Sequence, residues 1–312
     1  MSSSYLAEPR GRDWLIFALV PLFMSSNLVL GRGIAGEVSP FATAFIRWAA
    51  AVLIMLPFLY RYWPTLFSTL RKNAGLLFSL GFMHIVICGG VVYWSLTYTT
   101  ASNATLIYTT SPLFIILFER VFAGRKVANR ELIGILIAFV GVMPIVLRGD
   151  LGAIADLQFN KGDLGMLAAS MAFAVYSILL RKNGARAIPP MLLFTLVAMA
   201  GSLLVLPIVI WEIAQGGMLP HTTSAWSKLA GVTLIASLAN YLAFQHSVRI
   251  FGPPLAGTVL YTSSPASIML AVIFLGEDFR YYHAIGFVLV LGGVILATLR
   301  LGSIKKTGVS KT

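Results

Sequence analysis

The sequence predicts an all-α integral membrane protein with ten transmembrane helices arranged as two inverted five-helix repeats. Of the 312 residues, 58% are hydrophobic and 11% are charged, and the mean hydropathy is +0.86. Soluble domains are about 45 to 50% apolar and 25% charged. Apolar segments of about 20 residues, the length that crosses a bilayer, recur along the chain. The second half also repeats residues of the first half nearly in register.

The apolar segments give the ten predicted spans. Their expected bounds are 14–35, 39–60, 74–98, 102–122, 131–147, 162–181, 189–213, 225–248, 254–276 and 281–301. The first span follows two arginines and lacks a small-residue cleavage site, so we expect it to be retained. Pro40 falls in the first turn of the second span, where a proline is tolerated. A polar connection then divides the chain into a first repeat at 14–148, a loop at 149–161 and a second repeat at 162–301.

The two repeats match residue by residue. Asp13, Phe23, Leu30, Pro40, Leu56 and Pro57 correspond to Asp163, Phe173, Leu180, Pro190, Leu206 and Pro207. Ile133-Gly134 and Gly141-Val142 correspond to Ile285-Gly286 and Gly293-Val294. Because five is an odd number of helices, the second repeat would enter the membrane from the opposite side. This predicts an inverted pair with a substrate site near midplane between the repeats.

Charges in the loops predict the orientation, since Lys and Arg in short loops stay in the cytoplasm. With the N-terminus inside, most of the 23 Lys and Arg residues fall in inner segments. Both termini are therefore expected in the cytoplasm. The acidic residues lean to the outside, at Glu37, Asp150, Asp156, Asp163, Glu212, Glu277 and Asp278.

Two short stretches in the middle of apolar segments predict broken helices. Tyr108-Thr109-Thr110-Ser111-Pro112 is nearly copied as Tyr261-Thr262-Ser263-Ser264-Pro265. Each proline removes a backbone donor and crowds the carbonyl four residues earlier. Such a kink belongs where a helix faces protein or a wet cavity, and hydroxyls can satisfy the freed carbonyls. Broken, hydroxyl-rich helices in both halves indicate a transporter site, although Ser/Thr-Pro kinks also occur as plain packing features.

The chain resembles the drug/metabolite transporter superfamily, in its ten-helix EamA branch. The resemblance rests on Ser25-Ser26-Asn27, Gly31-Arg32, Phe45-Ile46-Arg47-Trp48 and the two Gly-Val pairs at 141 and 293. It implies two five-helix repeats, a bacterial inner-membrane location and export of amino acids, as in aromatic amino acid exporters, or of related metabolites. One departure is Arg125, near where many members have an acidic residue after glycine. The second repeat keeps Gly276-Glu277 at this place.

Arg47 and His84 are the ionisable side chains expected deepest in the membrane. Arg47 lies roughly 12 Å from the outer end of its span, where a guanidinium is costly unless it faces a polar interior or snorkels. It could hold a substrate carboxylate, or bond structurally to carbonyls freed by a kink. His84 could bind substrate or relay a proton, or be a neutral histidine bonded to a neighbouring helix. No acidic residue is deep enough to be an obvious proton carrier, so a facilitator is expected, with proton exchange through His84 as the rival.

Polar-tipped aromatic residues, hydroxyls and amides complete the predicted site. The candidate substrate-binding residues are Asn27, Arg47, His84, Tyr93, Trp94, Tyr108, Thr109, Ser111, Tyr176, Asn240, Tyr241, Tyr261, Thr262 and Ser264. The candidate helix-kink residues are Pro112 and Pro265. A cavity of this kind suits a small zwitterion or monoanion with an apolar side chain. We therefore expect export of aromatic and other apolar amino acids by alternating access.

Other function classes are less well supported. The sequence has no His-Glu-x-x-His pair, nucleophile elbow or Gly-x-x-x-x-Gly-Lys loop, so no enzyme activity, metal or cofactor is expected. Its basic residues form no stripe for nucleic acid, and its single cysteine, Cys88, cannot form an intramolecular disulfide. The expected partners are a small-molecule substrate and membrane lipid, with the protein working as a monomer. Export of organic cations or drugs, export of nucleotide sugars and an integral-membrane enzyme remain as alternatives.

Overall fold

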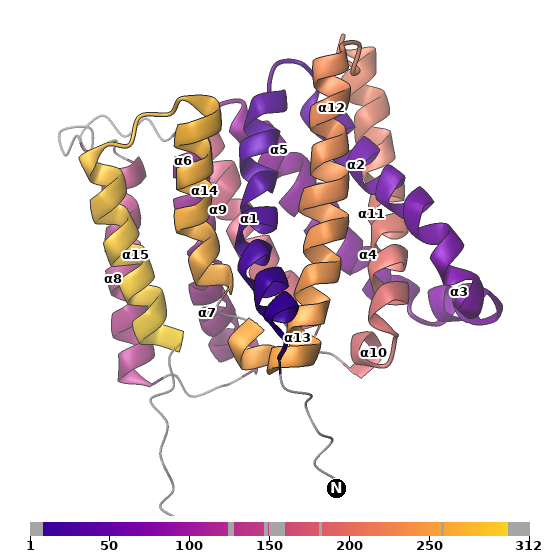
Figure 1. Cartoon of the computed structure of the whole chain (residues 1–312), viewed down its shortest axis with the longest axis horizontal. Coiled ribbons are helices and arrows are strands. Elements are labelled where there is room, and N and C mark those ends of the chain that lie inside the picture. The colour runs from indigo at the N-terminus through magenta and orange to yellow at the C-terminus, as the bar shows by residue number, and fades with distance from the viewer. Residues whose placement is uncertain are drawn as a thin grey trace, which may run out of the picture.

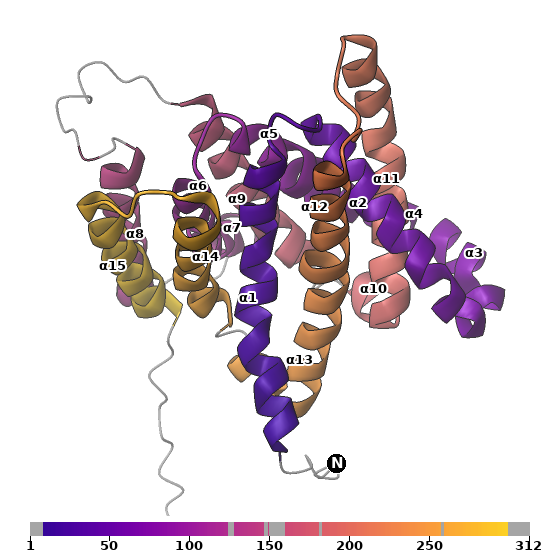
Figure 2. The same ribbon diagram turned by 45° about the horizontal axis from the view of Figure 1, so that its top comes forward.

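The computed structural model describes residues 9–123, 128–146, 149, 160–180, 183–256 and 259–298. Apart from one isolated bridge between Ala35 and Val38, every element in this part of the chain is a helix. Most helices stand side by side as a bundle, and α3 projects to one side (Figures 1 and 2). The all-helical prediction is therefore confirmed for the described residues.

Ten helical elements form the first half. Their bounds are α1 Gly11–Ile34, α2 Pro40–Met55, the 3₁₀ helix η1 Leu56–Tyr62, α3 Trp63–Lys72, α4 Ala74–Gly81, the π-helix η2 Phe82–Val91, α5 Val92–Leu96, α6 Ala101–Tyr108, α7 Ser111–Ala123 and α8 Asn129–Val146. The second half has eight helical elements among the described residues. Its elements are α9 Lys161–Leu179, α10 Asn183–Arg186, α11 Pro190–Ala214, α12 Thr223–Gly231, the π-helix η4 Val232–Ala239, α13 Asn240–Ala256, α14 Val259–Leu275 and α15 Tyr281–Thr298.

Seven helical stretches in the described part are long and apolar enough to cross a membrane. They are 11–34, 40–72, 74–96, 101–121, 161–179, 190–214 and 223–247. Two shorter apolar helices, 266–275 and 281–293, follow them. The chain is thus a multi-pass membrane protein, and the full set of ten spans stays a prediction.

Two predicted bounds differ from the structure. The second span was expected to end at residue 60, but helical structure continues through η1 and α3. In α3, Leu66 is buried while the polar residues Thr65, Ser68 and Arg71 are exposed, so this helix is amphipathic and a search for apolar runs misses it. The ninth span was expected to begin at residue 254, but α13 continues to Ala256 and α14 begins at Val259.

The predicted break in the fourth span is present. Helix α6 ends at Tyr108, and α7 begins at Ser111, so Pro112 lies in the first turn of α7, where its missing N–H is no loss. Hydroxyls satisfy the carbonyls at the break, since Ser111 Oγ donates to Tyr108 O and Thr109 Oγ1 donates to Thr105 O at 2.8 Å. The second copy is different, because α14 runs as one helix through residue 265. The break is therefore present in the first copy, and the kink expected at Pro265 stays a prediction.

The two π-helices occupy repeat-related positions, with η2 beginning at Phe82 and η4 at Val232. Neither was predicted, because a π-helix keeps the same apolar composition as the α-helix around it. In η4 the Ser237 hydroxyl donates to Val232 O, five residues earlier, at 3.0 Å. Short π-helical stretches are rare and often lie at functional sites.

Helix packing is similar in the two halves: a contact made by a helix of one half is matched by the equivalent helix of the other half. Helix α8 packs on α15, and α2 packs on α11, which are pairs between equivalent helices. Helix α1 packs on η4, α13 and α14, while α9 packs on η2, α6 and α7. Close approach depends on glycine: a Cβ on Gly141 would lie 2.6 Å from Leu289, and one on Gly293 would lie 2.5 Å from Gly134 O.

Candidate functional site

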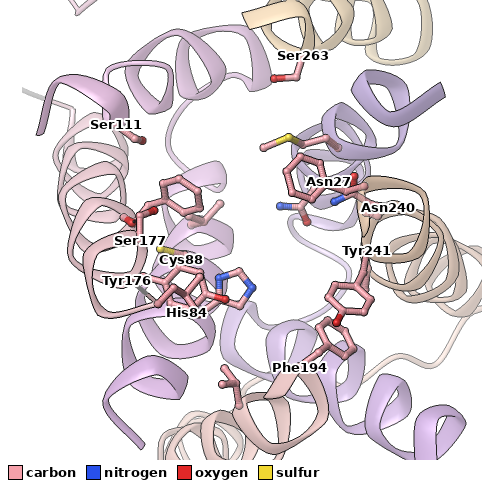
Figure 3. Close-up of a pocket in the computed structure, with 18 of the residues that line it drawn as sticks. Asn27, His84, Cys88, Ser111, Tyr176, Ser177, Phe194, Asn240, Tyr241 and Ser263 are labelled. Carbon is pink, nitrogen blue, oxygen red and sulfur yellow. The ribbon is translucent and has the colours of Figure 1, made fainter. Parts of the chain in front are cut away.

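A cavity of about 640 Å³ lies among helices of both halves. This volume is in the range of small-molecule sites. Nine of the fourteen predicted substrate-binding residues line it, contributed by α1, α2, η2, α6, α7, α9 and α13. They are Asn27, Arg47, His84, Tyr108, Thr109, Ser111, Tyr176, Asn240 and Tyr241. Figure 3 shows His84 and Tyr176 on one side of this cavity and Phe194 and Tyr241 on another.

Three of the other five candidates, Tyr93, Trp94 and Thr262, do not join this lining. Tyr93 is buried behind it and bonds to Arg47 and Asn27. Trp94 packs against Tyr98 instead, with ring centroids 5.2 Å apart. Thr262 is exposed, and its hydroxyl donates to Val259 O within its own helix. The side chains of Tyr261 and Ser264 lie outside the described residues, as do those of the two proline candidates, Pro112 and Pro265.

Arg47 joins three transmembrane segments to its own. Its Nε–H donates to Ser237 Oγ of η4 at 2.6 Å, and Nη1 donates to Asn27 Oδ1 of α1 at 2.5 Å and to Tyr93 OH of α5 at 2.7 Å. Nη2 has one long contact, 3.4 Å to Ala236 O. A guanidinium has five N–H donors. Since Nε and Nη1 use three of them in short hydrogen bonds, Nη2 can still donate to a bound molecule.

Arg47 has no carboxylate partner among the described residues. Its guanidinium lies 4.6 Å from the Trp48 ring centroid, which adds a cation–π contact. The described residues that line the cavity include no Asp or Glu. The cavity therefore carries a fixed positive charge that neutral groups solvate and that no described carboxylate balances, which favours an anionic group on a bound molecule.

Seven rings form a continuous aromatic arc around the cavity. Its order is Tyr108, Phe173, Tyr176, His84, Trp48, Phe194 and Tyr241. His84 stacks on Tyr176 with centroids 4.6 Å apart, and Phe194 stacks on Tyr241 at 4.2 Å. Trp48 lies between the two stacks, at 5.2 Å from His84 and 5.8 Å from Phe194. Such an arc offers planar faces on which an aromatic or aliphatic group can pack.

Several polar atoms of lining residues are buried without a hydrogen-bond partner. They are His84 Nδ1, Trp48 Nε1, Asn240 Oδ1 and Tyr241 OH. A buried polar atom left unpaired costs about 1–3 kcal/mol, and each one therefore calls for a partner such as water or a bound molecule. Their concentration at one cavity marks it as the place where a ligand would complete the structure.

The two halves contribute unequal chemistry to the cavity. Arg47 and Trp48 of the first half correspond, at the offset that pairs Pro57 with Pro207, to Val197 and Ala198 of the second half. All four residues line the cavity. One side is thus cationic, and the repeat-related side is aliphatic, so a molecule with a charged end and an apolar end has a preferred orientation.

Sequence reasoning missed part of the lining, including Trp48, Cys88, Phe173, Ser177 and Phe194. Ser177 could have been found, because it is the repeat counterpart of Asn27, and Phe173 is the counterpart of Phe23. Phe194 carries no such signal, since it is one of many apolar residues in α11 and its counterpart is Ala44.

Known proteins share this sequence pattern and this fold. The chain matches the EamA-like transporter family over residues 13–147 and 160–299. The "Uncharacterized transporter YyaM" of Bacillus subtilis is 25% identical over 278 residues, which cover 89% of this chain and 90% of the relative. The biotin transporter of Salmonella typhimurium is 24% identical over 257 residues, 82% of each chain. The S-adenosylmethionine uptake transporter of Rickettsia bellii is 25% identical over 174 residues, 55% of each chain. A solved structure titled "Crystal structure of protein" has the same fold, with a TM-score of 0.57 at 20% identity over 93% of this chain and 98% of that chain.

Proposed function

Because the chain belongs to the EamA-like transporter family, we propose that it exports small carboxylate-bearing metabolites, foremost amino acids with aromatic or other apolar side chains. Transport would run by alternating access across the bacterial inner membrane, with both termini in the cytoplasm. The observation that carries this proposal is the cavity between the halves, in which Arg47 has no anionic partner among the described residues and four polar atoms of the lining are unpaired.

The proposed substrate orientation follows from the unequal sides of the cavity. The substrate carboxylate would lie at Nη2 of Arg47, displacing the long contact to Ala236 O. Its apolar side chain would pack on the aromatic arc and against Val197 and Ala198. The unpaired Asn240 Oδ1 and Tyr241 OH supply acceptors for an ammonium group. A nucleotide sugar fits less well, because two phosphates call for several basic residues.

The relatives support a carboxylate and leave the rest of the substrate open. S-adenosylmethionine and biotin, the molecules named for two of them, both carry a carboxylate and a planar or compact ring system. Amino acids share the carboxylate. Fixed contacts to that group combined with an adaptable aromatic wall would give broad specificity, since one methylene in an apolar pocket is worth only about 1–3 kcal/mol.

The pairing of helices between the halves supports an inverted-repeat arrangement, which is common among alternating-access transporters. We propose that the cycle runs as a facilitator, since no Asp or Glu is among the described lining residues. Proton exchange through His84 is the rival. The family membership and the transporter names of the relatives support a transport role in preference to an enzymatic one.

Labelled phenylalanine uptake into proteoliposomes tests the substrate proposal without altering the protein. Unlabelled phenylalanine should compete well, while its amide, which lacks the carboxylate, should compete at least about tenfold more weakly, because a hydrogen bond to a charged group is worth about 1.5–3 kcal/mol. Arg47→Ala should abolish this discrimination, and Arg12→Ala, at an exposed arginine, should keep it. An imposed pH gradient should not drive accumulation.

Each alternative has its own outcome in this assay. Equal competition by the amide would contradict the carboxylate contact. Uptake of S-adenosylmethionine or biotin without amino acids would replace the substrate, and transport of organic cations alone would refute the carboxylate class altogether.

A further inference from the structure

We infer that Glu212 and Glu277 are gating residues, which together latch one face of the protein and hold the cavity open toward the opposite face. This inference rests on the proposed alternating-access function. Both carboxylates belong to the second half, and both bind the N-terminus of a helix in the first half. The α11–α12 and α14–α15 connections lie at the top of Figure 1, opposite the N-terminus and α10.

Glu277 binds the start of α6 through three hydrogen bonds. Ala101 N–H donates to Oε1 at 2.8 Å, and the N–H and hydroxyl of Ser102 donate to Oε2 at 3.1 and 2.7 Å. Gly276, at a φ of +64°, ends α14 in the left-handed conformation that glycine adopts without strain. This turn directs the chain from α14 across to α6. A carboxylate here also interacts favourably with the positive end of the helix dipole.

Glu212 makes the matching contact at the start of α2. Ala42 N–H donates to Oε2 at 3.0 Å, and Phe41 N–H donates to Oε1 at 3.4 Å. The segment after α11 adds two bonds, since Ser39 N–H donates to Met218 O at 2.9 Å and Met218 N–H donates to Ser39 Oγ at 2.7 Å. The outer end of α11 is thereby fastened to α2 of the other half.

The repeats do not carry this pair of carboxylates twice. The counterpart of Glu212 is Tyr62, at the offset that pairs Pro57 with Pro207, and the counterpart of Gly276-Glu277 is Gly124-Arg125. In an inverted pair these positions belong to the opposite face of the membrane. Since neither counterpart is an acid, these two carboxylate contacts to helix N-termini are not repeated at the other face, where Asp13 bonds instead to His246 of α13 at 2.8 Å.

The cavity extends away from the latched face. Its lining includes Leu180 after α9, Ala185 and Ile188 between α9 and α11, and Gln245 in α13. These residues lie on the side of α10, which Figure 1 places at the same end as the N-terminus. The cavity thus extends toward the side predicted to be cytoplasmic. In this inference both carboxylate contacts separate before the cavity opens on the other side.

A single cysteine in the cavity reports which face is open. Ser177→Cys in a Cys88→Ser background keeps the side-chain size and places one thiol on the lining, where Figure 3 shows Ser177. Labelling by a membrane-impermeant sulfonate thiol reagent is compared in right-side-out and inverted vesicles. The reporter should be labelled from the N-terminal side. Glu212→Gln and Glu277→Gln are added to the reporter one at a time. Each should raise labelling from the other side about tenfold, because each change removes charge-assisted bonds.

Matched variants separate a latch from general damage. Asp278→Asn neutralises the exposed neighbour of Glu277, whose described contact is to Arg280 within the same segment, and should leave labelling unchanged. Ser102→Ala removes one of the three bonds to Glu277 and should give an intermediate increase. Thermal unfolding of each variant shows that the helices remain folded.

Two results would overturn the inference, and only the second would also contradict the proposed alternating access. Unchanged labelling in both glutamine variants would refute the latch and leave the proposed transport intact, since this assay needs no substrate. Equal labelling from both sides in the reporter alone would show that the latched face is not closed, and would contradict alternating access as well.

Discussion

Four hydrogen bonds fix the Arg47 guanidinium between η4, α1 and α5. The sequence left a structural and a substrate-binding role open for this arginine; the structure shows the first, and the second is our proposal. Through Nε and Nη1 it is a structural junction, while Nη2 and the unbalanced charge are available to the cavity. Hydrogen bonds from a charged group contribute more to stability than neutral ones, about 1.5–3 kcal/mol each, so the junction also keeps the cationic side of the cavity rigid.

Tyr93→Phe isolates the structural role of this junction. The change removes the hydroxyl that accepts from Arg47 at 2.7 Å and donates to Asn27 at 2.9 Å, and it leaves the ring against Gly31. We expect the free energy of unfolding to fall by about 1–3 kcal/mol, the cost of an unpaired buried donor. Tyr98→Phe, at a half-exposed tyrosine, should have no effect. Thermal unfolding in detergent compares the two, and equal stability would show that the Tyr93 hydroxyl is dispensable.

At the scale of single helices, the structure separates two proline motifs that look alike in sequence. The fourth span breaks between Tyr108 and Ser111, and the hydroxyls of the motif take up the exposed carbonyls. The copy around Pro265 stays in one helix. The motif alone could not predict this difference, because a proline removes the same backbone donor in both places. Packing against neighbouring helices decides whether the helix is interrupted.

Pro112→Ala and Pro265→Ala therefore should differ. Alanine at 112 restores an N–H that can bond to Tyr108 O and allows α6 and α7 to join, which would remove the break beside the cavity. We expect the transport rate per inserted protein to fall about tenfold, the factor that corresponds to 1.4 kcal/mol, while Pro265→Ala has a smaller effect. Initial rates normalised to the amount of protein in the membrane make the comparison. An equal loss in both variants would contradict the distinction.

At the scale of the whole molecule, the cavity is assembled from repeat-related helices that carry different side chains. Apolar periodicity and the repeat predicted the helical class and most helix positions. Nine of the fourteen candidate residues, Arg47, His84 and Asn240 among them, line the cavity, while their role in binding stays a prediction. The π-helices and the amphipathic α3 were out of reach, because neither changes the apolar pattern that marks a span. The aromatic arc was also hidden, since Phe194 in an apolar helix is indistinguishable from a lipid-facing residue until the helices are packed.

Transport by a cavity-filling variant tests most directly whether this cavity is the transport route. Ser177→Trp places an indole in a space of about 640 Å³, whereas Leu203→Trp adds the same group to an exposed position of α11. Labelled phenylalanine exchange in proteoliposomes, at matched protein content and thermal stability, compares the two variants with the original chain. The predicted result is loss of exchange in Ser177→Trp and normal exchange in Leu203→Trp; normal exchange in Ser177→Trp would contradict the account.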